Sequence, residues 1–394
     1  MRFQNVAIPA EMIWSSPFAR WQGMLAQTSS LDLASSVTRR ALSDRGMDLE
    51  QIDDVMLGMT VPQPEYFFGP PTLAGQLGIP ARTGPIVSQA CATTVAALQA
   101  AATSAQVGEA TELVVTTDRT SNGPTLIYPT PGAPGGAPST EDFVRTNFAF
   151  DPWSGTSMLA AAELVAAEHG IGRDELDDLT ALRSAQYQRA LAEDRRFQRR
   201  YMVPVEVLAG RNAVVLDEDE GVRAIDRDHI RALRPAVEDG LHTGATQTHP
   251  ADGCAGAIVT TVDTARDLSA GPIVHLLATG FARVAPTHMP EAPVPAALQA
   301  LAAAELSVDQ VDAITTHNPF AVNDILFARA TGIDLTAMNA FGSSLIWGHP
   351  QAPTGMRAIA ELVTELTERG GGVGLFTGCA AGDTAAALVI RVDR

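Results

Sequence analysis

Apolar runs of strand length alternate with helix-like patterns along most of the chain. The runs at 112–117 and 373–378 each follow a helical pattern, at 91–107 and 356–370, and a last buried strand is predicted at 385–392. Strands that alternate with helices are typical of parallel or mixed sheets covered by helices. The pattern therefore predicts an α/β fold.

A weak internal repeat refines this prediction. Residues 41–55 and 300–314 each read as the end of an Ala/Leu helix, an acidic turn, and a Gln-Ile-Asp or Gln-Val-Asp that leads into an apolar run. Asp53 aligns with Asp312 at the same offset. A helix–turn–strand unit that occurs twice predicts two α/β halves made by duplication.

The segment between the two copies has a different amino-acid composition. Residues 121–155 are rich in Pro, Gly and Ser and predict a loop without much regular structure, whereas helices are expected at 156–170 and 173–193. Residues 205–250 look irregular and polar. A long insertion in a compact fold usually carries binding function, and we interpret 121–250 as an inserted loop domain.

The expected domain organisation follows from the repeat and the insertion. Residues 1–120 and 251–270 would form the N-terminal half, and residues 271–394 would form the C-terminal half.

Composition and charge narrow the class of protein. Apolar residues make up 46% of the 394 positions, and no run approaches the ~20 apolar residues of a membrane span or forms the core of a signal peptide. We therefore expect a cytoplasmic protein without a membrane span. The net charge of −18 argues against a nucleic-acid partner. All 27 basic residues are arginine, so an anionic ligand must be held by Arg, His or backbone N–H groups.

Two of the three cysteines lie in settings that suit covalent chemistry. Cys91, in SQACATT, precedes a helical run, and Cys379, in TGCAAGD, follows a strand-like run. A thiol at a helix N-terminus is expected to have a lowered pKa and to act as a nucleophile. Each could also be a small buried cysteine, and this is the favoured interpretation for Cys254. The spacing predicts neither a disulfide framework nor a metal site.

Two histidines are candidates for the same chemistry. His349 lies in WGHPQAPTG, a constrained loop that favours a chemical role over packing. His317 follows the run AITT, and a strand end is where an α/β fold presents functional groups. His317 could instead close a turn. A nucleophile, a base and a second thiol are what thioester exchange with carbon–carbon bond formation or cleavage requires.

Taken in order, these motifs resemble the thiolase family along almost the whole chain. The segments that carry the resemblance are SQACATT, the helices at 158–186, TGATQTHPADGCAGA at 243–257, HNPFA, GHPQAPTGMR and GCAAGD. The GHP block with a reactive cysteine on either side is the specific part. The resemblance implies a five-layer αβαβα fold of two duplicated halves plus a loop domain, and usually a homodimer or homotetramer.

The resemblance also implies roles for these residues. Cys91 would take the acyl group from a coenzyme A thioester, His349 would activate it and contribute to an oxyanion site, and Cys379 would move the α-proton. His317 replaces an Asn found in many members, which resembles the sterol-carrier thiolase branch. Coenzyme A would be a substrate rather than a fixed cofactor.

Further roles are carried over position by position. The backbone N–H groups of Cys91 and Ala381 would form a second oxyanion hole, although the family's Gly-rich run is altered here at Ala381. Coenzyme A would be contacted by four residues: Ser157, Met158, Arg223 and Thr248. Trp347 stands where a smaller residue is usual, and PEYFFGPP at 64–71 replaces a family segment before the nucleophile.

The expected function is a thiolase-type acyltransferase that condenses acyl-CoAs or cleaves 3-ketoacyl-CoA, in fatty acid or sterol metabolism. Two alternatives stay open. One is a ketoacyl-synthase-like condensing enzyme, which would use Cys91, His317 and His349 and leave Cys379 without a role. The other is a non-catalytic acyl-CoA-binding subunit, which the altered Gly-rich run would permit.

Overall fold

The computed structural model describes residues 1–79, 83–209 and 212–393, so the parts of the predicted ranges at 80–82, 210–211 and 394 lie outside it. A mixed sheet of 11 strands crosses the molecule in the order β13-β14-β15-β12-β1-β11-β6-β4-β5, with β2 and β3 paired to β11. Its strands are β1 (Val6–Pro9), β2 (Ile13–Ser15), β3 (Ala19–Arg20), β4 (Asp54–Gly58), β5 (Ile86–Val87), β6 (Glu112–Arg119), β11 (Ala251–Thr261), β12 (Ile273–Arg283), β13 (Ala313–His317), β14 (Gly372–Ala380) and β15 (Thr384–Val392).

Helices cover both halves of this sheet, and two short hairpins stand apart from it. The helices are α1 (Ser30–Asp44), α2 (Gly69–Leu77), α3 (Thr93–Gly108), α4 (Phe143–Ala149), α5 (Met158–Glu168), α6 (Arg173–Ala190), α7 (Ala192–Arg195), α8 (Arg227–Arg231), α9 (Val262–Leu268), α10 (Pro293–Ala303), α11 (Ala321–Thr331), α12 (Ser344–Trp347) and α13 (Pro353–Glu368). The hairpins are β7 (Thr125–Tyr128) with β8 (Ser139–Asp142), and β9 (Val205–Ala209) with β10 (Asn212–Leu216).

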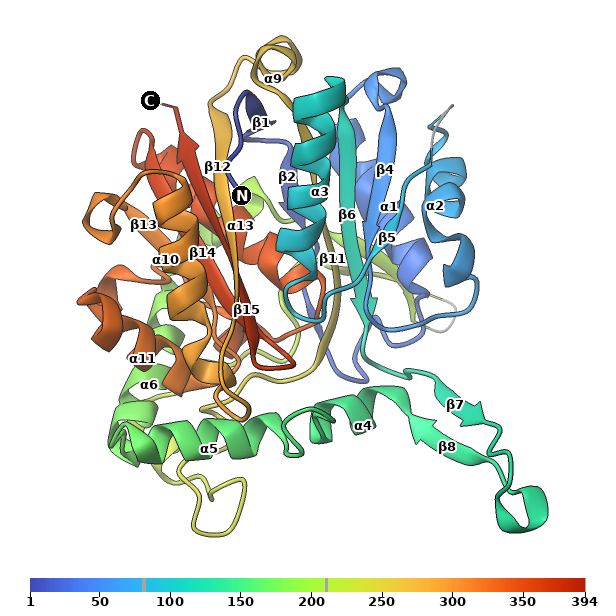
Figure 1. The fold of residues 1–394 in the computed structure, drawn as a ribbon. Helices are drawn as coiled ribbons and strands as arrows, with labels where there is room; N and C mark the ends of the chain where they lie inside the picture. Colours follow the sequence, from blue (N-terminus) through green and yellow to red (C-terminus); the bar gives the residue numbers. More distant parts are fainter. Residues whose placement is uncertain (80–82, 210–211, 394) are drawn as a thin grey trace.

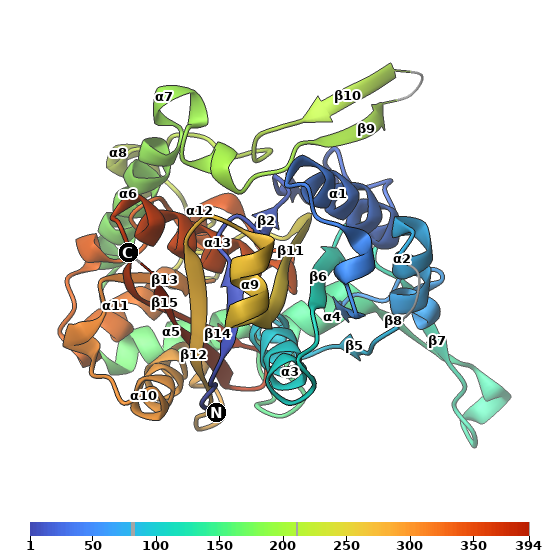
Figure 2. The same ribbon diagram turned by 90° about the horizontal axis from the view of Figure 1, so that it is seen from above.

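The layers follow from the packing of the helices. Helices α3 and α13 pack on each other and on strands of both halves, α1 and α2 cover the outer side of the first half, and α10 covers the outer side of the second. Figures 1 and 2 show the blue-to-cyan first half beside the orange-to-red second half. This confirms the predicted α/β fold with five layers. Every residue of α13 from Pro353 to Leu366 is buried, as a central helix requires.

The two copies of the repeat make the same contacts. Asp53 donates its N–H to the Thr111 carbonyl over 2.9 Å, and its carboxylate accepts the Thr111 N–H over 2.9 Å. Asp312 makes the equivalent pair of bonds with Val373, both 2.8 Å long. Each aspartate thus joins a strand to its parallel neighbour, β4 to β6 and β13 to β14. The shared Asp marks the same structural position in two duplicated halves.

The segment between β6 and β11 differs in part from the prediction. Helices α5 and α6 lie where two helices were predicted, but 121–155 also contains the β7–β8 hairpin and α4, and 205–250 contains the β9–β10 hairpin and α8. The expectation of irregular structure was therefore wrong in these places. The β7–β8 hairpin extends away from the body (Figure 1) and its side chains are mostly exposed, so no buried face marks it in the sequence.

Candidate active site

Cys91 lies in a tight bend immediately before α3, two residues upstream of the first helical residue. Ala90 has a positive φ of 45°, which is uncommon for a residue with a side chain. Thr93 holds the bend, because its hydroxyl accepts the Gln89 N–H and donates to the Ala90 carbonyl. The Cys91 thiol is thereby presented at the N-terminal end of α3, close to the predicted position.

A single threonine joins this bend to the loop that carries His349. The Thr94 hydroxyl donates to the Ala352 carbonyl over 2.6 Å and accepts the Met356 N–H over 3.0 Å. A side chain at Gly355 would come within 2.9 Å of Thr94, so this close approach of α3 and α13 requires glycine. The N-terminal ends of two central helices therefore meet at the site.

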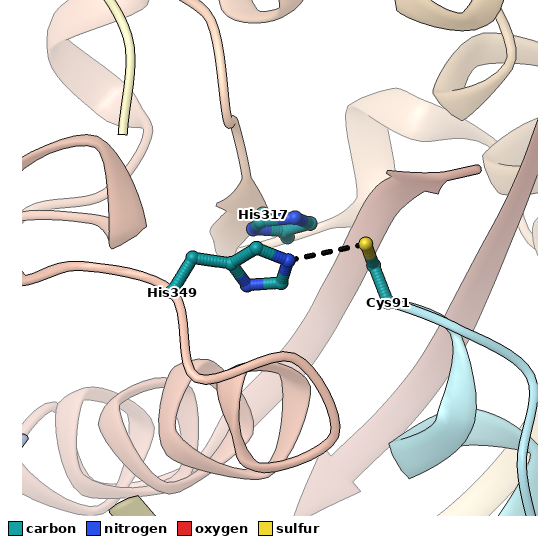
Figure 3. A group of neighbouring side chains, drawn as sticks. All are labelled: Cys91, His317 and His349. Atoms are coloured by element: carbon teal, nitrogen blue, oxygen red, sulfur yellow. Dashed lines mark hydrogen bonds between the residues drawn. The ribbon is translucent and has the colours of Figure 1, made fainter. Parts of the chain in front are cut away.

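His349 contacts the thiol directly. Its Nε2 lies 3.1 Å from the Cys91 Sγ (Figure 3). Its Nδ1 lies 2.6 Å from the Thr354 hydroxyl. When Nδ1–H donates to Thr354, the Nε2 lone pair faces the thiol as a base. Thr354 was not predicted from the sequence.

The ring of His317 stacks on the ring of His349. The two rings stack with centroids 4.1 Å apart, and the His317 Nδ1 lies 2.8 Å from the Ser344 hydroxyl. The His317 Nε2 is buried without a partner among the described residues. The Cys91 sulfur and one ring nitrogen each of His317 and His349 lie within 4.8 Å of one another. The predicted strand-end histidine thus belongs to the same cluster as the thiol.

Cys379 is the last residue but one of strand β14 and lines the same cavity as Cys91 and His349. The Asn323 side-chain amide donates to its Sγ over 3.4 Å. Sequence reasoning missed Asn323, which lies six residues after His317 at the start of α11. Cys254 is fully buried in β11, as its structural interpretation predicted.

The altered Gly-rich run keeps a usable backbone donor. Ala381 does not have a positive φ, whereas Gly382 and Asp383 take the left-handed conformation with φ of 80° and 57°. The Ala381 N–H lies close enough to Cys91 to lower the pKa of its thiol. Alanine is therefore compatible with a donor at this position.

Burial outweighs every other effect on the ionisation of the cluster. It raises the pKa of Cys91 to about 12, although the N–H groups of Ala381 and Cys91 oppose the shift. Burial, and then His317, hold the pKa of His349 well below its usual value. Burial also lowers the pKa of His317 to about 3 and raises the pKa of Cys379 well above that of an ordinary thiol. The expected lowering of the Cys91 pKa by the helix dipole was therefore wrong, and the resting thiol and imidazole are neutral.

This resting state predicts an unusual pH dependence of alkylation. An ordinary thiol with a pKa near 8.5 becomes fully reactive by about pH 10. Because the pKa of Cys91 is raised, its thiolate fraction should still be rising there. We expect the rate of iodoacetamide labelling of Cys91, followed by peptide mapping, to keep increasing through about pH 10. A plateau below about pH 8 would instead mean a resting thiolate–imidazolium pair.

A cavity of about 660 Å³ opens onto this cluster. Its walls are mainly apolar and include Phe148 of α4 and Phe320 before α11. Of the four residues predicted to bind coenzyme A, Met158 and Thr248 line it, whereas Ser157 and Arg223 are not among the lining residues. The Ser157 hydroxyl caps α5, and Arg223 is exposed.

Two features singled out in the sequence, Trp347 and the segment at 64–71, do not line the cavity. Trp347 is buried in the core, where its ring packs edge-on against Phe18 at 5.4 Å and under the Arg357 guanidinium at 5.1 Å. Tyr66–Phe68, from the PEYFFGPP segment, form a short helical turn in which Phe67 is 79% exposed. Neither element lines the cavity among the described residues.

In the described part of the chain, no helix has the length and apolar character needed to cross a membrane.

Comparison with known proteins agrees with this geometry. Residues 10–263 match the family model for the thiolase N-terminal domain, and residues 271–392 match that for the thiolase C-terminal domain. An acetyl-CoA acetyltransferase of Synechocystis sp. is 27% identical over 385 residues, which cover 95% of this chain and 96% of the relative.

Solved structures show the same fold. The crystal structure of the Bacillus anthracis acetyl-CoA acetyltransferase matches with a TM-score of 0.91 and 25% identity, over 99% of both chains. The human mitochondrial 3-ketoacyl-CoA thiolase, solved in complex with CoA, matches with a TM-score of 0.88 and 24% identity, over 98% of this chain and 97% of the other. Since the two family models together span nearly the whole sequence, the chain belongs to the thiolase family.

Proposed function

We propose that this protein is a thiolase that transfers acyl groups between coenzyme A thioesters through an acyl-enzyme at Cys91. The observation that carries the proposal is the contact of 3.1 Å between the Cys91 Sγ and the His349 Nε2, at the end of a cavity that also contains Cys379. A neutral thiol with an adjacent neutral imidazole becomes a nucleophile by giving up its proton as it attacks.

In the first step the Cys91 Sγ attacks the thioester carbonyl carbon while His349 takes the thiol proton. The negative oxygen of the tetrahedral intermediate accepts hydrogen bonds from the backbone N–H groups of Cys91 and Ala381. The carbon–sulfur bond to coenzyme A then breaks, and His349 returns the proton to the departing thiolate. Coenzyme A is thus a substrate and product, and no bound cofactor is invoked.

In the second step Cys379 acts as the acid and base for carbon–carbon bond formation. It gives its thiol proton to the stacked imidazoles of His317 and His349, and the resulting thiolate takes the α-proton of a second acyl-CoA. The enolate oxygen accepts hydrogen bonds from His317 and His349, and the α-carbon attacks the acyl carbonyl. Cys91 leaves as a thiolate and recovers a proton from the imidazolium. Thiolysis of a 3-ketoacyl-CoA is the reverse sequence.

The position of Cys379 favours this mechanism over the ketoacyl-synthase-like alternative, in which that thiol has no role. It shares the cavity with Cys91, and the Asn323 amide holds it in place.

The proposal also includes a homodimer or homotetramer and a cytoplasmic location. It includes coenzyme A contacts from Ser157 and Arg223.

The test is to incubate the protein with a 3-ketoacyl-CoA and free coenzyme A and to separate the thioesters formed. We expect acetyl-CoA and the acyl-CoA shortened by two carbons in equal amounts. Hydrolysis to free acids, or unchanged substrate across a range of chain lengths, would contradict the proposal.

Substitution of His317 separates a chemical role from a structural one. His317→Asn should retain substantial turnover, because the amide offers a donor to the same oxygen. His317→Ala should lose roughly 10²–10³-fold, the usual effect of removing one oxyanion donor. Turnover and thermal unfolding should be measured on both variants. Equal losses of stability without a selective loss of turnover would leave His317 as a turn residue.

A further inference from the structure

A glutamine that plays no part in this mechanism lies beside the nucleophile. The Gln351 Oε1 accepts the Cys91 thiol hydrogen with a sulfur–oxygen distance of 3.4 Å, so the thiol contacts Gln351 as well as His349. Gln351 is only 6% exposed, and it lines the cavity. The side chain therefore faces the space that an acyl group on Cys91 would enter.

The backbone at Gln351 is held in an unusual conformation. Gln351 has a φ of 59°, in the left-handed region that disfavours residues with a side chain. Its carbonyl accepts the Thr354 N–H, and the next residue, Ala352, donates its N–H to the buried carboxylate of Asp118 over 2.9 Å. A residue held in an unfavourable conformation by bonds to its carbonyl and to the next N–H is a candidate for a functional role.

The NH₂ group of Gln351 has no acceptor in the described part of the chain. By contrast, two other amides that line the cavity are committed, since Asn147 donates to the Phe143 carbonyl and Gln247 to the Thr243 carbonyl. This NH₂ group is not among the fully enclosed atoms and has accessible surface in the cavity, so an apolar ligand that displaced water from it would leave it unpaired at a cost. The free NH₂ group therefore points to an acceptor on the ligand.

The carboxylate that binds the neighbouring residue is already paired with other donors. The Asp118 carboxylate that accepts the Ala352 N–H also accepts the Thr60 and Val61 N–H groups and the Thr60 hydroxyl. Val61 and Val144 of α4 both approach Gly123, and both line the cavity. An unsubstituted alkyl chain in this space would leave the amide without a hydrogen bond.

Acylation makes the requirement stricter. When Cys91 becomes a thioester it loses the hydrogen that Oε1 accepts, so both ends of the amide then lack a partner. A hydroxyl group can accept from the NH₂ group and can also donate to the oxygen, whereas a carbonyl can only accept. We propose that Gln351 determines specificity by hydrogen bonding to a hydroxyl group near the thioester, so that the acyl substrates are hydroxyacyl thioesters. This inference rests on the proposed acylation of Cys91.

The experiment compares acylation of Cys91 by butanoyl-CoA with acylation by its 2-, 3- and 4-hydroxy derivatives, measured as the rate of adduct formation by mass spectrometry. The wild-type protein should prefer at least one hydroxy isomer by about 10- to 100-fold, the range expected for leaving a buried amide unpaired. Gln351→Met, which keeps the length without the amide, should abolish this preference, chiefly by speeding acylation by butanoyl-CoA. Gln351→Leu, which has neither the N–H donor nor the oxygen acceptor, should also lose it.

The matched control is Gln247→Met, which removes a cavity amide that is already paired and should leave the preference for hydroxy derivatives over butanoyl-CoA unchanged. Circular dichroism and thermal unfolding establish that each variant is folded, and if one is not, the other Gln351 variant decides. No preference in the wild-type protein, or a preference that survives both Gln351 substitutions, would overturn the inference while leaving the proposed function intact. Failure of every thioester to acylate Cys91 would overturn both.

Discussion

Cys91→Ala is expected to lower turnover by at least about 10⁴-fold, because loss of a nucleophile removes the covalent route altogether. The change deletes one sulfur atom at the margin of a cavity, and the Thr93 and Thr94 bonds that hold the bend do not involve it. The fold should therefore persist. Steady-state turnover and thermal unfolding, measured on the same preparation, check both statements.

Cys254→Ala is the matched control for this prediction. Cys254 is fully buried in β11, away from the cavity lining, so its replacement removes a thiol of the same kind without touching the site. Its turnover should stay near that of the wild-type protein. Comparable turnover in the two variants would rule out Cys91 as the nucleophile.

Cys379→Ser is expected to separate the two steps of the reaction. Exchange of the α-proton of acetyl-CoA with solvent should fall by about 10²–10⁴-fold, the usual contribution of a positioned acid or base. The reason is that a serine hydroxyl is a much weaker acid than a thiol, so it supplies far less of the required anion. Exchange into deuterated solvent, followed by nuclear magnetic resonance, measures this directly.

Acylation of Cys91 should survive in the same variant, since that step uses His349 and the backbone donors. Asn323 would keep a hydrogen-bond acceptor in the serine oxygen, which limits structural change around the site. Proton exchange at the wild-type rate would remove Cys379 from the mechanism, and loss of acylation as well would assign it to the first step.

Much of the architecture could be predicted because it repeats local patterns. The Asp53 and Asp312 repeat could be read from the sequence because each copy joins neighbouring parallel strands through the same pair of bonds. Cys91 and His317 could be selected because they lie just before a helix and at the end of a strand, where side chains are presented to a site, and His349 because it lies in a constrained loop rich in Gly and Pro. These residues come together because α3 packs against α13, and the order of the motifs along the chain does not show this contact directly.

What escaped prediction depends on long-range burial. The dipole of α3 suggests a lowered pKa for Cys91, but the sequence does not reveal that the thiol is enclosed by segments from both halves, and burial reverses the direction of the pKa shift. Asn323 and Gln351 were missed for the same reason, since each contacts a cysteine more than 50 residues away. The exposed β7–β8 hairpin was missed because it has no buried face.

Mass spectrometry of the protein after incubation with acyl-CoA shows directly whether Cys91 carries the acyl group. The wild-type protein is incubated with a set of acyl-CoAs that includes acetyl-CoA and hydroxybutanoyl-CoA, quenched in acid, digested and mapped by mass spectrometry. We expect the mass of the acyl group on the peptide that contains Cys91, and its loss when free coenzyme A is added before the quench. An adduct on Cys379 or Cys254 instead, or none with any thioester, would contradict it.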